Sequence, residues 1–313
     1  MSNIVLTGGT GFVGRPTTAA LLASGARVLA VTRDPGRLPG GLPDGVTAIG
    51  ADLLGDPASL YAAMRAARPE VLVHAAWSTE HGRYWTDPRN RDWTARTLCL
   101  VEAFVEAGGR RVVTVGTCAE YEWSSLGTDR CREASTPLRP HTLYGSAKQA
   151  AAQGVADYCR SAGVGHAHAR LFMLFGAGEQ PERLVPATIR SLLAGRRASV
   201  TSGRQIRDFL DVRDAGAALA ALAQSGITGA INVASGQPLA IGALVATIAA
   251  AIGRPDLLGI GDLSDRPDDP PYLVADIDRL THELGFRPGI TLRRGLNDAI
   301  EHWRAEALRP PDA

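Results

Sequence analysis

The sequence predicts an α/β fold in which a doubly wound parallel sheet, with helices on both faces, is followed by a smaller α/β lobe. Short apolar runs alternate with alanine-rich helical patterns through the first 175 residues. The apolar runs are residues 4–6, 27–32, 46–50, 71–75, 112–115 and 168–174. The helical patterns occupy residues 15–24, 58–67, 91–107 and 146–162. Ligands of such sheets bind beyond the carboxyl ends of the strands, where the strand order reverses.

The pattern changes after Gly176, where proline and glycine interrupt the chain more often. Helical periodicity nevertheless recurs over residues 184–194, 212–223 and 241–252. We therefore expect a first domain over residues 1–176 and a smaller lobe over residues 177–313. Some segments of the second part are expected to return to the first domain.

The composition is that of an ordinary soluble globular protein, with 45% hydrophobic and 21% charged residues. The 33 basic and 32 acidic side chains leave a formal net charge of +1, and no basic block stands out. Neither nucleic acid nor a membrane is therefore expected as a partner. The four cysteines form no Cys-x-x-Cys pair, so we expect a reduced protein without a metal site. No leader-like or membrane-spanning apolar stretch is found, which favours a cytoplasmic location.

A glycine-rich turn follows the first apolar run and opens the first helical pattern. Gly9, Gly11 and Gly14 have the spacing Gly-x-Gly-x-x-Gly, which in this context is typical of a dinucleotide site. Gly9 and Gly11 permit a tight turn and a close approach of the pyrophosphate, and Gly14 lets the helix pack on the strand. The sequence therefore predicts that the first domain is of the Rossmann type.

The end of the second strand bears on which nicotinamide cofactor binds. A free ribose 2′-hydroxyl usually meets an acidic side chain there, whereas a 2′-phosphate requires a cation. Arg33 is the first charged residue beyond the strand and offers a planar fork of donors, which favours NADP(H). The alternative is NAD(H), with Asp34 holding the ribose hydroxyls and Arg33 solvated. Asp52, at the end of the third strand, either accepts from the adenine amino group or caps a helix.

Three polar residues form the candidate catalytic group. Thr117 ends a buried-type strand, and Tyr144 and Lys148 lie four residues apart at the start of a long helical pattern. Such a pair shares one face of a helix, so Lys148 can approach both the Tyr144 ring oxygen and the cofactor ribose. Because a nearby ammonium favours phenolate, we expect Lys148 to lower the pKa of Tyr144, which then exchanges a proton with a carbonyl or alcohol. Thr117 would hydrogen-bond the same substrate oxygen.

With these residues the chain resembles the extended short-chain dehydrogenases/reductases, the NAD(P)-dependent family of nucleotide-sugar epimerases, dehydratases and reductases. The matching motifs are the glycine turn, Asp52-Leu53, His74-Ala75-Ala76, Thr117 four residues before Tyr121, Tyr144-x-x-x-Lys148 and residues 203–209. The resemblance implies a Rossmann domain that binds NAD(P), a substrate-binding lobe, and a homodimer formed through the helices at residues 91–107 and 146–162. The implied cofactor site consists of Gly8, Gly9, Gly11, Phe12, Val13, Gly14, Arg33, Asp52, Leu53, Ala75, Ala76, Tyr144 and Lys148.

The resemblance also implies that arginines hold the nucleotide diphosphate of the substrate. Arg183, Arg207 and Arg266 match the family's positions, and bidentate guanidinium groups suit phosphate. Alternatively, Arg207 pairs with Asp208 or Asp211, and Arg266 pairs with Asp268.

Two departures from the family pattern narrow the chemistry. Cys118 and Ala119 follow Thr117 where dehydratases of the family carry an Asp-Glu pair, so sugar dehydration is not expected. Met173 stands where the family usually has an asparagine that contacts the substrate, which leaves the nucleotide sugar open.

The loop over residues 77–85 is rich in aromatic side chains and follows the fourth strand, at the ligand-binding edge of the sheet. We expect His81, Tyr84 and Trp85 to line the sugar site. The alternative is an aromatic cluster that caps the sheet edge.

These features predict an NADPH-dependent ketoreductase that acts on a nucleotide-linked deoxy keto-sugar. Arg33 favours net reduction, because a reductase draws on the NADPH pool whereas an epimerase recycles one tightly held NAD. The first alternative is an NAD-dependent nucleotide-sugar epimerase. The second is a non-catalytic NADP(H)-binding regulator, which loss of Tyr144 or Lys148 would indicate; both residues are present.

Overall fold

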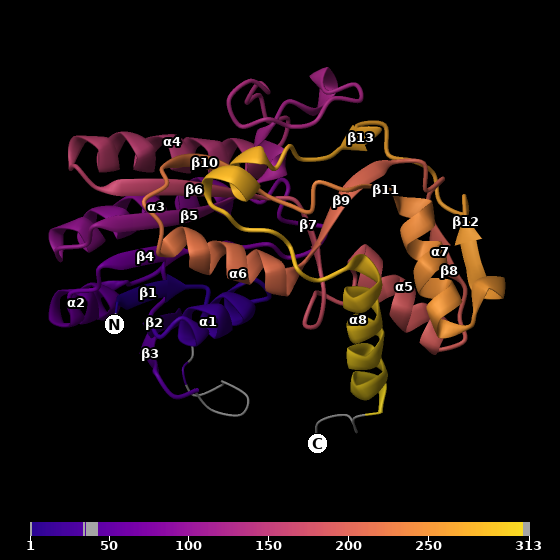
Figure 1. The fold of residues 1–313 in the computed structure, drawn as a ribbon, viewed down its shortest axis with the longest axis horizontal. Coiled ribbons are helices and arrows are strands. Elements are labelled where there is room, and N and C mark those ends of the chain that lie inside the picture. Colours follow the sequence, from indigo (N-terminus) through magenta and orange to yellow (C-terminus); the bar gives the residue numbers. More distant parts are fainter. Residues whose placement is uncertain (1, 34, 36–42, 309–313) are drawn as a thin grey trace.

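The computed structural model describes residues 2–33, 35 and 43–308, and Figure 1 shows a layered α/β body beside a smaller lobe. The body contains a seven-stranded sheet in the order β10-β6-β5-β4-β1-β2-β3, and every pairing in it is parallel. The strands are β1 (Asn3–Thr7), β2 (Arg27–Thr32), β3 (Val46–Gly50), β4 (Val71–His74), β5 (Arg111–Thr117), β6 (Gly165–Leu171) and β10 (Gly229–Val233). The predicted doubly wound parallel sheet is confirmed.

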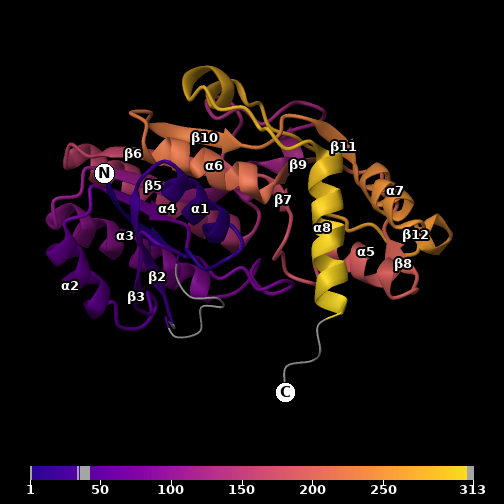
Figure 2. The ribbon, with the colours of Figure 1, turned by 60° about the horizontal axis from the view of Figure 1, so that its bottom comes forward.

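Helices cover both faces of this sheet, as Figures 1 and 2 show. They are α1 (Gly14–Ala23) and α6 (Val212–Ala223) on one face, and α2 (Ala58–Ala67), α3 (Arg89–Glu106) and α4 (Leu143–Ser161) on the other. Neighbouring residues of β1 face opposite cores: Leu6 packs on the α1 and α6 side, and Val5 on the α3 side. Burial on both faces explains why the strands read as continuous apolar runs.

Two late segments return to the body after the lobe has begun. Helix α6 packs so closely on α1 that a Cβ on Gly216 would lie 2.6 Å from the Pro16 carbonyl carbon. Strand β10 then pairs with β6 and extends the sheet. The strand order reverses at β1, which lies between β2 and β4, so a ligand crevice is expected at the carboxyl ends of these strands.

The lobe is built around β9 (Ile206–Asp211), which pairs with three short strands, and around three helices that share one apolar core. Its other elements are β7 (Met173–Phe175), β8 (Ala198–Val200), β11 (Pro238–Ala240), β12 (Leu258–Ile260), β13 (Tyr272–Leu273), α5 (Leu184–Leu193), α7 (Ile241–Ile252) and α8 (Leu292–Ala307). In the described part of the chain, no helix is both long and apolar enough to cross a membrane.

The expected single strand over residues 168–174 is wrong, because the chain changes sheets there. The Phe172 amide still donates to the Val233 carbonyl beside β6, but the next residues form β7 and pair with β9 of the lobe. The apolar run is therefore continuous because both halves of the segment are buried, each in a different sheet.

Candidate active site

The glycine turn between β1 and α1 brings backbone segments closer than a larger residue would allow. Gly8 has a φ of +72°, and a Cβ there would lie 2.9 Å from the Ala76 amide nitrogen. A Cβ on Gly14 would lie 1.9 Å from the Gly8 carbonyl oxygen. The Gly11 amide donates to that oxygen at 2.9 Å and closes the turn. This cradle fits a dinucleotide, whose diphosphate must approach the backbone at a helix N-terminus.

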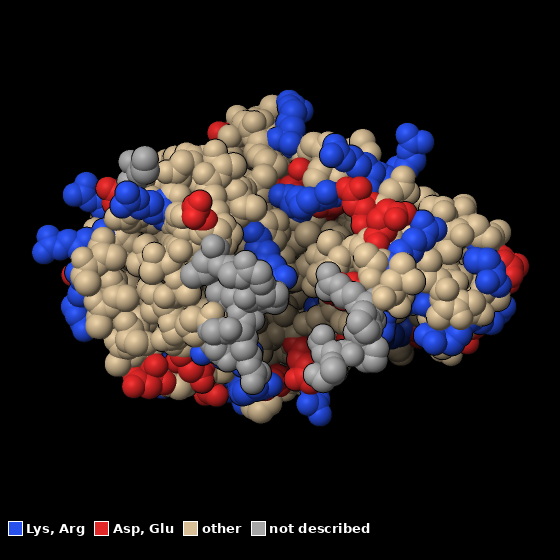
Figure 3. Space-filling model, turned by 90° about the horizontal axis from the view of Figure 1, so that it is seen from below, with Lys and Arg blue, Asp and Glu red and all other residues tan. Residues whose placement is uncertain are grey.

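A cavity of about 1010 Å³ opens beside this turn. Of the residues expected at a cofactor site, those that line it are Gly8, Gly11, Arg33, Asp52, Leu53 and Ala76. The others, Gly9, Phe12, Val13, Gly14, Ala75, Tyr144 and Lys148, do not line the cavity. Val13 and Ala75 pack on the core beneath the turn, and Gly14 shapes the turn itself. On the face seen in Figure 3, positively charged side chains border the hollow between body and lobe.

Arginine side chains contribute to the wall of this cavity. Arg33 is exposed and lines the cavity together with Arg15, whose Nε donates to the Thr10 carbonyl at 2.9 Å. Asp34, the alternative partner of the cofactor ribose, lies outside the described residues. Arg89 lines the cavity as well, so the described part of the wall combines the glycine turn with three guanidinium groups.

Asp52 lies in the cavity wall and does not cap a helix. Its carboxylate accepts from the Leu54 amide at 3.1 Å. At the start of α2 it is Asp56 whose carboxylate accepts from a backbone amide, that of Ala58, at 2.9 Å. The capping alternative for Asp52 is therefore wrong.

Thr117 ends β5 and begins the short 3-10 turn Cys118–Glu120. Its hydroxyl oxygen accepts from the Ala119 amide at 3.2 Å, and its own amide donates to the Glu120 carboxylate at 2.9 Å. This reciprocal capping box fixes the residue at the end of the strand. Because the hydroxyl oxygen is engaged as an acceptor, its hydrogen can be donated to a ligand.

Tyr144 lies in the first turn of α4 and is buried, with 8% of its surface exposed. A Cβ on Gly145 would lie 2.3 Å from the Ala119 carbonyl, so glycine is required for α4 to approach the turn after Thr117. Burial raises the pKa of Tyr144, and a hydrogen bond with Thr117 opposes this only in part. The expectation that Lys148 lowers this pKa is not met, because the lysine ammonium has other partners.

Lys148 is buried and directed at the sheet and at an indole ring. Its Nζ donates to the Val115 carbonyl at 2.8 Å and lies 3.9 Å from the centre of the Trp77 ring. Burial lowers the pKa of Lys148 to about 7, and the negative charge of Glu120 opposes the shift. Trp77 also lines the cavity beside the glycine turn, so the ring that carries the ammonium forms part of the cavity wall.

Aromatic rings surround Tyr144. Tyr84 meets the Tyr144 ring edge to face at a centroid distance of 4.9 Å, and Trp85 does so at 5.8 Å. Trp123 is in turn perpendicular to Trp85 at 6.2 Å. The structure therefore places Tyr84 and Trp85 against Tyr144. His81, by contrast, is exposed, and its amide donates to the Gln180 side chain at 3.0 Å.

The three arginines expected at the substrate lie in different surroundings. The Arg183 guanidinium lies 5.4 Å from the centre of the Tyr84 ring. Arg266 is exposed, and its charge acts on both His81 and Tyr84. These two arginines thus face the same aromatic loop.

Arg207 is buried and pairs with Asp269 at 2.6 Å. The alternative pairing of Arg207 with Asp208 or Asp211 is wrong. Asp208 accepts from the Ser235 hydroxyl, and Asp211 binds Arg213.

Two residues at this site were not singled out by sequence reasoning. Trp77 belongs to the aromatic loop, but its contact with Lys148 depends on the fold. Glu120 is fully buried beneath Thr117. The spacing Thr-x-x-Glu, a capping box at the end of a strand, is the signal that could have identified it.

Comparison with known proteins agrees with this geometry. The model of the NAD dependent epimerase/dehydratase family matches residues 4–234. A dTDP-6-deoxy-L-talose 4-dehydrogenase (NAD(P)(+)) from Kitasatospora kifunensis is 29% identical, with 99% of this chain and 97% of the relative covered. A UDP-glucose 4-epimerase from Azospirillum brasilense is 28% identical, with 91% and 87% covered.

A solved structure of MoeE5 in complex with UDP-glucuronic acid and NAD superposes with a TM-score of 0.82 at 28% identity, covering 97% of this chain and 100% of MoeE5. The glycine cradle, the Thr117, Tyr144 and Lys148 group and the match over residues 4–234 lead to one conclusion. The chain belongs to the NAD dependent epimerase/dehydratase family.

Proposed function

We propose that the chain is a cytoplasmic, NADPH-dependent ketoreductase that acts on a keto group of a nucleotide-linked deoxysugar. The observation that best supports this function is the arrangement of acid/base groups around Thr117. Tyr144 packs against the rings of Tyr84 and Trp85. The Glu120 carboxylate, by contrast, is fully buried and is taken by the Thr117 amide, His168 and Arg170. One proton donor beside a hydride donor suffices for the reduction of a ketone, while dehydration requires further acid/base groups.

The residues of the cavity would hold NADP(H). The glycine turn would face the diphosphate, Asp52 the adenine and Arg33 the 2′-phosphate. When bound, the reduced nicotinamide supplies the hydride. Tyr144 would give its proton to the substrate oxygen, and the Thr117 hydroxyl would donate to the same oxygen.

The substrate class is supported by the aromatic loop and by a relative. Tyr84 and Trp85 present apolar rings near Tyr144, which suits a sugar carbon that lacks a hydroxyl. The relative from Kitasatospora kifunensis is named a 6-deoxy-L-talose 4-dehydrogenase. Arg183 and Arg266 would face the nucleotide diphosphate, and His81 would face the sugar. Arg207 would have to exchange its partner Asp269 to join them.

Turnover with NADPH tests this function. Purified protein would be incubated with a panel of nucleotide-linked 4-keto-6-deoxy sugars while NADPH absorbance is followed. We expect NADPH oxidation and a sugar alcohol that carries deuterium when deuterated NADPH is supplied. A panel that leaves NADPH unconsumed, at protein concentrations that bind NADPH, would contradict the proposal.

An NAD-dependent nucleotide-sugar epimerase is the second candidate, because a UDP-glucose 4-epimerase matches 91% of the chain. Such an enzyme returns the hydride to the carbon from which it came and keeps its cofactor. Purified protein that carries a nicotinamide resistant to exchange, and that interconverts UDP-glucose and UDP-galactose, would favour this candidate.

We also propose a homodimer formed through α3 and α4, which lie side by side on one face of the body (Figure 1). Such a pair would form a four-helix interface with its copy. Light scattering of the purified protein tests this, and the mass of a single chain would contradict it.

A further inference from the structure

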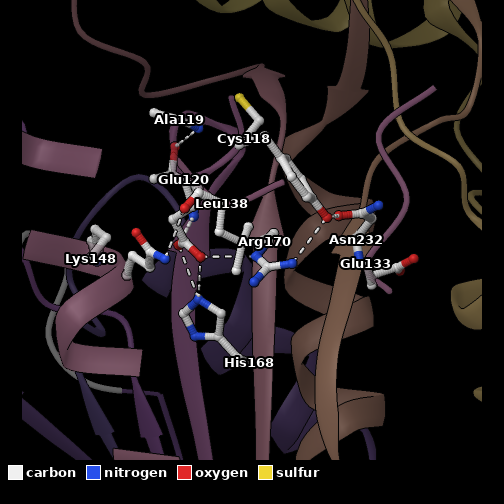
Figure 4. Close-up of polar contacts among 12 residues, drawn as sticks. Cys118, Ala119, Glu120, Glu133, Leu138, Lys148, His168, Arg170 and Asn232 are labelled. Carbon is white, nitrogen blue, oxygen red and sulfur yellow. Dashed lines mark hydrogen bonds and ion pairs between the residues drawn. The ribbon is translucent and has the colours of Figure 1, made fainter. Parts of the chain in front are cut away.

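A buried polar cluster lies directly beneath Thr117, and Figure 4 shows its side chains. Both Glu120 carboxylate oxygens lie 3.0 Å from His168 Nε2. Arg170 Nε donates to Glu120 at 2.9 Å. Arg170 also donates to the Tyr121 hydroxyl at 3.1 Å, which donates to Asn232 at 2.7 Å. The cluster therefore joins the turn after β5 to strands β6 and β10.

The backbone leaves room for this cluster at Gly116. A Cβ there would lie 2.2 Å from His168 Nε2 and 2.3 Å from the Glu120 carboxylate. The Thr117 amide donates to the same carboxylate from above. Three donors on two strands thus fix the carboxylate in one position.

The carboxylate is charged despite full burial. Burial would raise the pKa of Glu120, but the charges and hydrogen bonds of His168 and Arg170 outweigh it and hold this pKa at about 2. Lys148 lies close to this anion: its Nζ donates to the Val115 carbonyl, and a Cβ on Gly116, the next residue of β5, would lie 2.3 Å from the Glu120 carboxylate. The charge of Glu120 accordingly opposes the lowering of the Lys148 pKa by burial. The ionised Glu120 carboxylate can therefore stabilise the charged form of the buried Lys148 ammonium.

Three titratable groups face Lys148 from the elements packed around it. They are Glu120 on the 3-10 turn, His74 on β4 and Tyr144 on α4 itself. Burial and the Lys148 charge lower the pKa of His74 to about 3, so this imidazole is neutral. Burial raises the pKa of Tyr144, so this phenol is neutral too. Glu120 is therefore the charged group among the three.

We infer that the fixed Glu120 carboxylate is a positioning group that keeps the Lys148 ammonium charged beside the Trp77 wall of the cofactor cavity. Glu120 does not reach the reacting atoms, since it is fully buried and its oxygens are taken by Thr117, His168 and Arg170. It acts on the cofactor through Lys148, which as a cation can donate to ribose hydroxyls. The inference rests on the proposed function for the role of Lys148, but its test does not.

The test uses the fact that Lys148 is the single lysine among the 313 residues. Protein labelled with 13C- and 15N-lysine gives one side-chain Cε signal, whose shift with pH reports the ionisation of Lys148 directly. Neither substrate nor cofactor is needed, so failure of this test is separate from failure of the ketoreductase assay. We expect Glu120→Gln to lower the titration midpoint by about one unit, because an opposite charge is removed.

Glu133→Gln is the matched control. Glu133 is a partly buried carboxylate at the other end of the cluster, where it accepts from the Asn232 amide at 2.8 Å. We expect this variant to leave the Lys148 midpoint where it is in the wild type. A folded Glu120→Gln protein with an unchanged midpoint would overturn the inference, and so would an equal shift in both variants.

A double variant covers the case in which Glu120→Gln does not fold. Removing one partner of a buried ion pair is strongly destabilising, whereas replacing both by neutral groups is better tolerated. Glu120→Gln combined with Arg170→Gln removes both charges, and we expect the same lowered Lys148 midpoint. A wild-type midpoint in the double variant would overturn the inference.

Discussion

The Lys148 ammonium lies 3.9 Å from the centre of the Trp77 indole, on a ring that lines the cofactor cavity. Trp77 is itself fixed, since its Nε1 donates to Asn90 at 2.8 Å and its ring stacks on Trp93 at 5.6 Å. A cation over an aromatic face is stabilised in its charged form, most strongly where water is excluded. The indole therefore both shapes the cavity and holds the Lys148 ammonium against its wall.

Trp77→Leu should weaken NADPH binding by roughly tenfold, because the cavity loses ring surface and Lys148 loses a cation–π partner. Titration by NADPH fluorescence measures this. Trp303→Leu is the matched control, since Trp303 also carries a cation over its ring, Arg190 at 5.4 Å, but lies on α8 in the lobe. Equal weakening in both variants would assign the effect to lost stability and contradict the prediction.

Tyr144→Phe should lower kcat by roughly a hundredfold to ten-thousandfold, the range expected when a general acid is removed. The ring, and hence its edge-to-face contacts with Tyr84 and Trp85, is kept. NADPH affinity should therefore stay close to that of the wild type. Tyr158→Phe, on the same helix but near its other end, is the control and should retain full kcat. A Tyr144→Phe protein with more than about a tenth of the wild-type kcat would rule out this acid/base assignment.

Arg33→Ala should reduce kcat/KM for NADPH by roughly tenfold or more and leave kcat/KM for NADH almost unchanged. The reason is that a charge-assisted hydrogen bond to phosphate is lost, which only the 2′-phosphate of NADPH can accept. Arg27→Ala, an exposed arginine at the opposite end of β2, is the control and should change neither value. A wild-type preference for NADH that the Arg33 substitution does not alter would contradict the assignment.

Much of the site could be predicted because its signals are local. The glycine turn, Thr117 and the Tyr144 and Lys148 pair each lie at the end of a strand or the start of a helix, and parallel strands bring such ends to one edge. The helix α8 and the break between β6 and β7 could not be found in this way. Phe172 lies in a continuous apolar run. Only the hydrogen-bond partners on either side of Phe172 show that the first half of this run belongs to the sheet of the body and the second half to the sheet of the lobe.

Side-chain partners far apart in the sequence were the main source of error. Arg207 pairs with Asp269, which lies 62 residues away, and neither neighbouring aspartate is available to it. The Lys148 ammonium was expected near the tyrosine oxygen because the helix face allows it, but the direction of a long side chain depends on what surrounds it. Here Trp77 and the Val115 carbonyl decide that direction.

Glu179 should make the stability of the protein depend on pH. It lies between β7 and α5, is 5% exposed, and its Oε2 has no hydrogen-bond partner within the described residues. Burial raises the pKa of Glu179 to about 8, although the Arg183 charge opposes this. In the unfolded chain this carboxyl has its ordinary pKa of about 4.3. Between these two values the folded protein holds a proton that the unfolded chain has released, so stability is lost as the pH rises toward 8.

Glu179→Gln should therefore raise the melting temperature at pH 8, by an amount on the order of 5 °C, and have a much smaller effect at pH 5. The glutamine amide is neutral at pH 5 and at pH 8, so the folded variant never buries a negative charge at this position. The wild type avoids burying that charge only while Glu179 is protonated. Glu182→Gln is the control, because Glu182 lies three residues along the same loop and is exposed; it should change the melting temperature little at either pH. Differential scanning calorimetry at the two pH values separates the outcomes. A gain from Glu179→Gln that is equal at pH 5 and pH 8 would mean that the side chain acts through packing and not through the ionisation of its buried carboxyl.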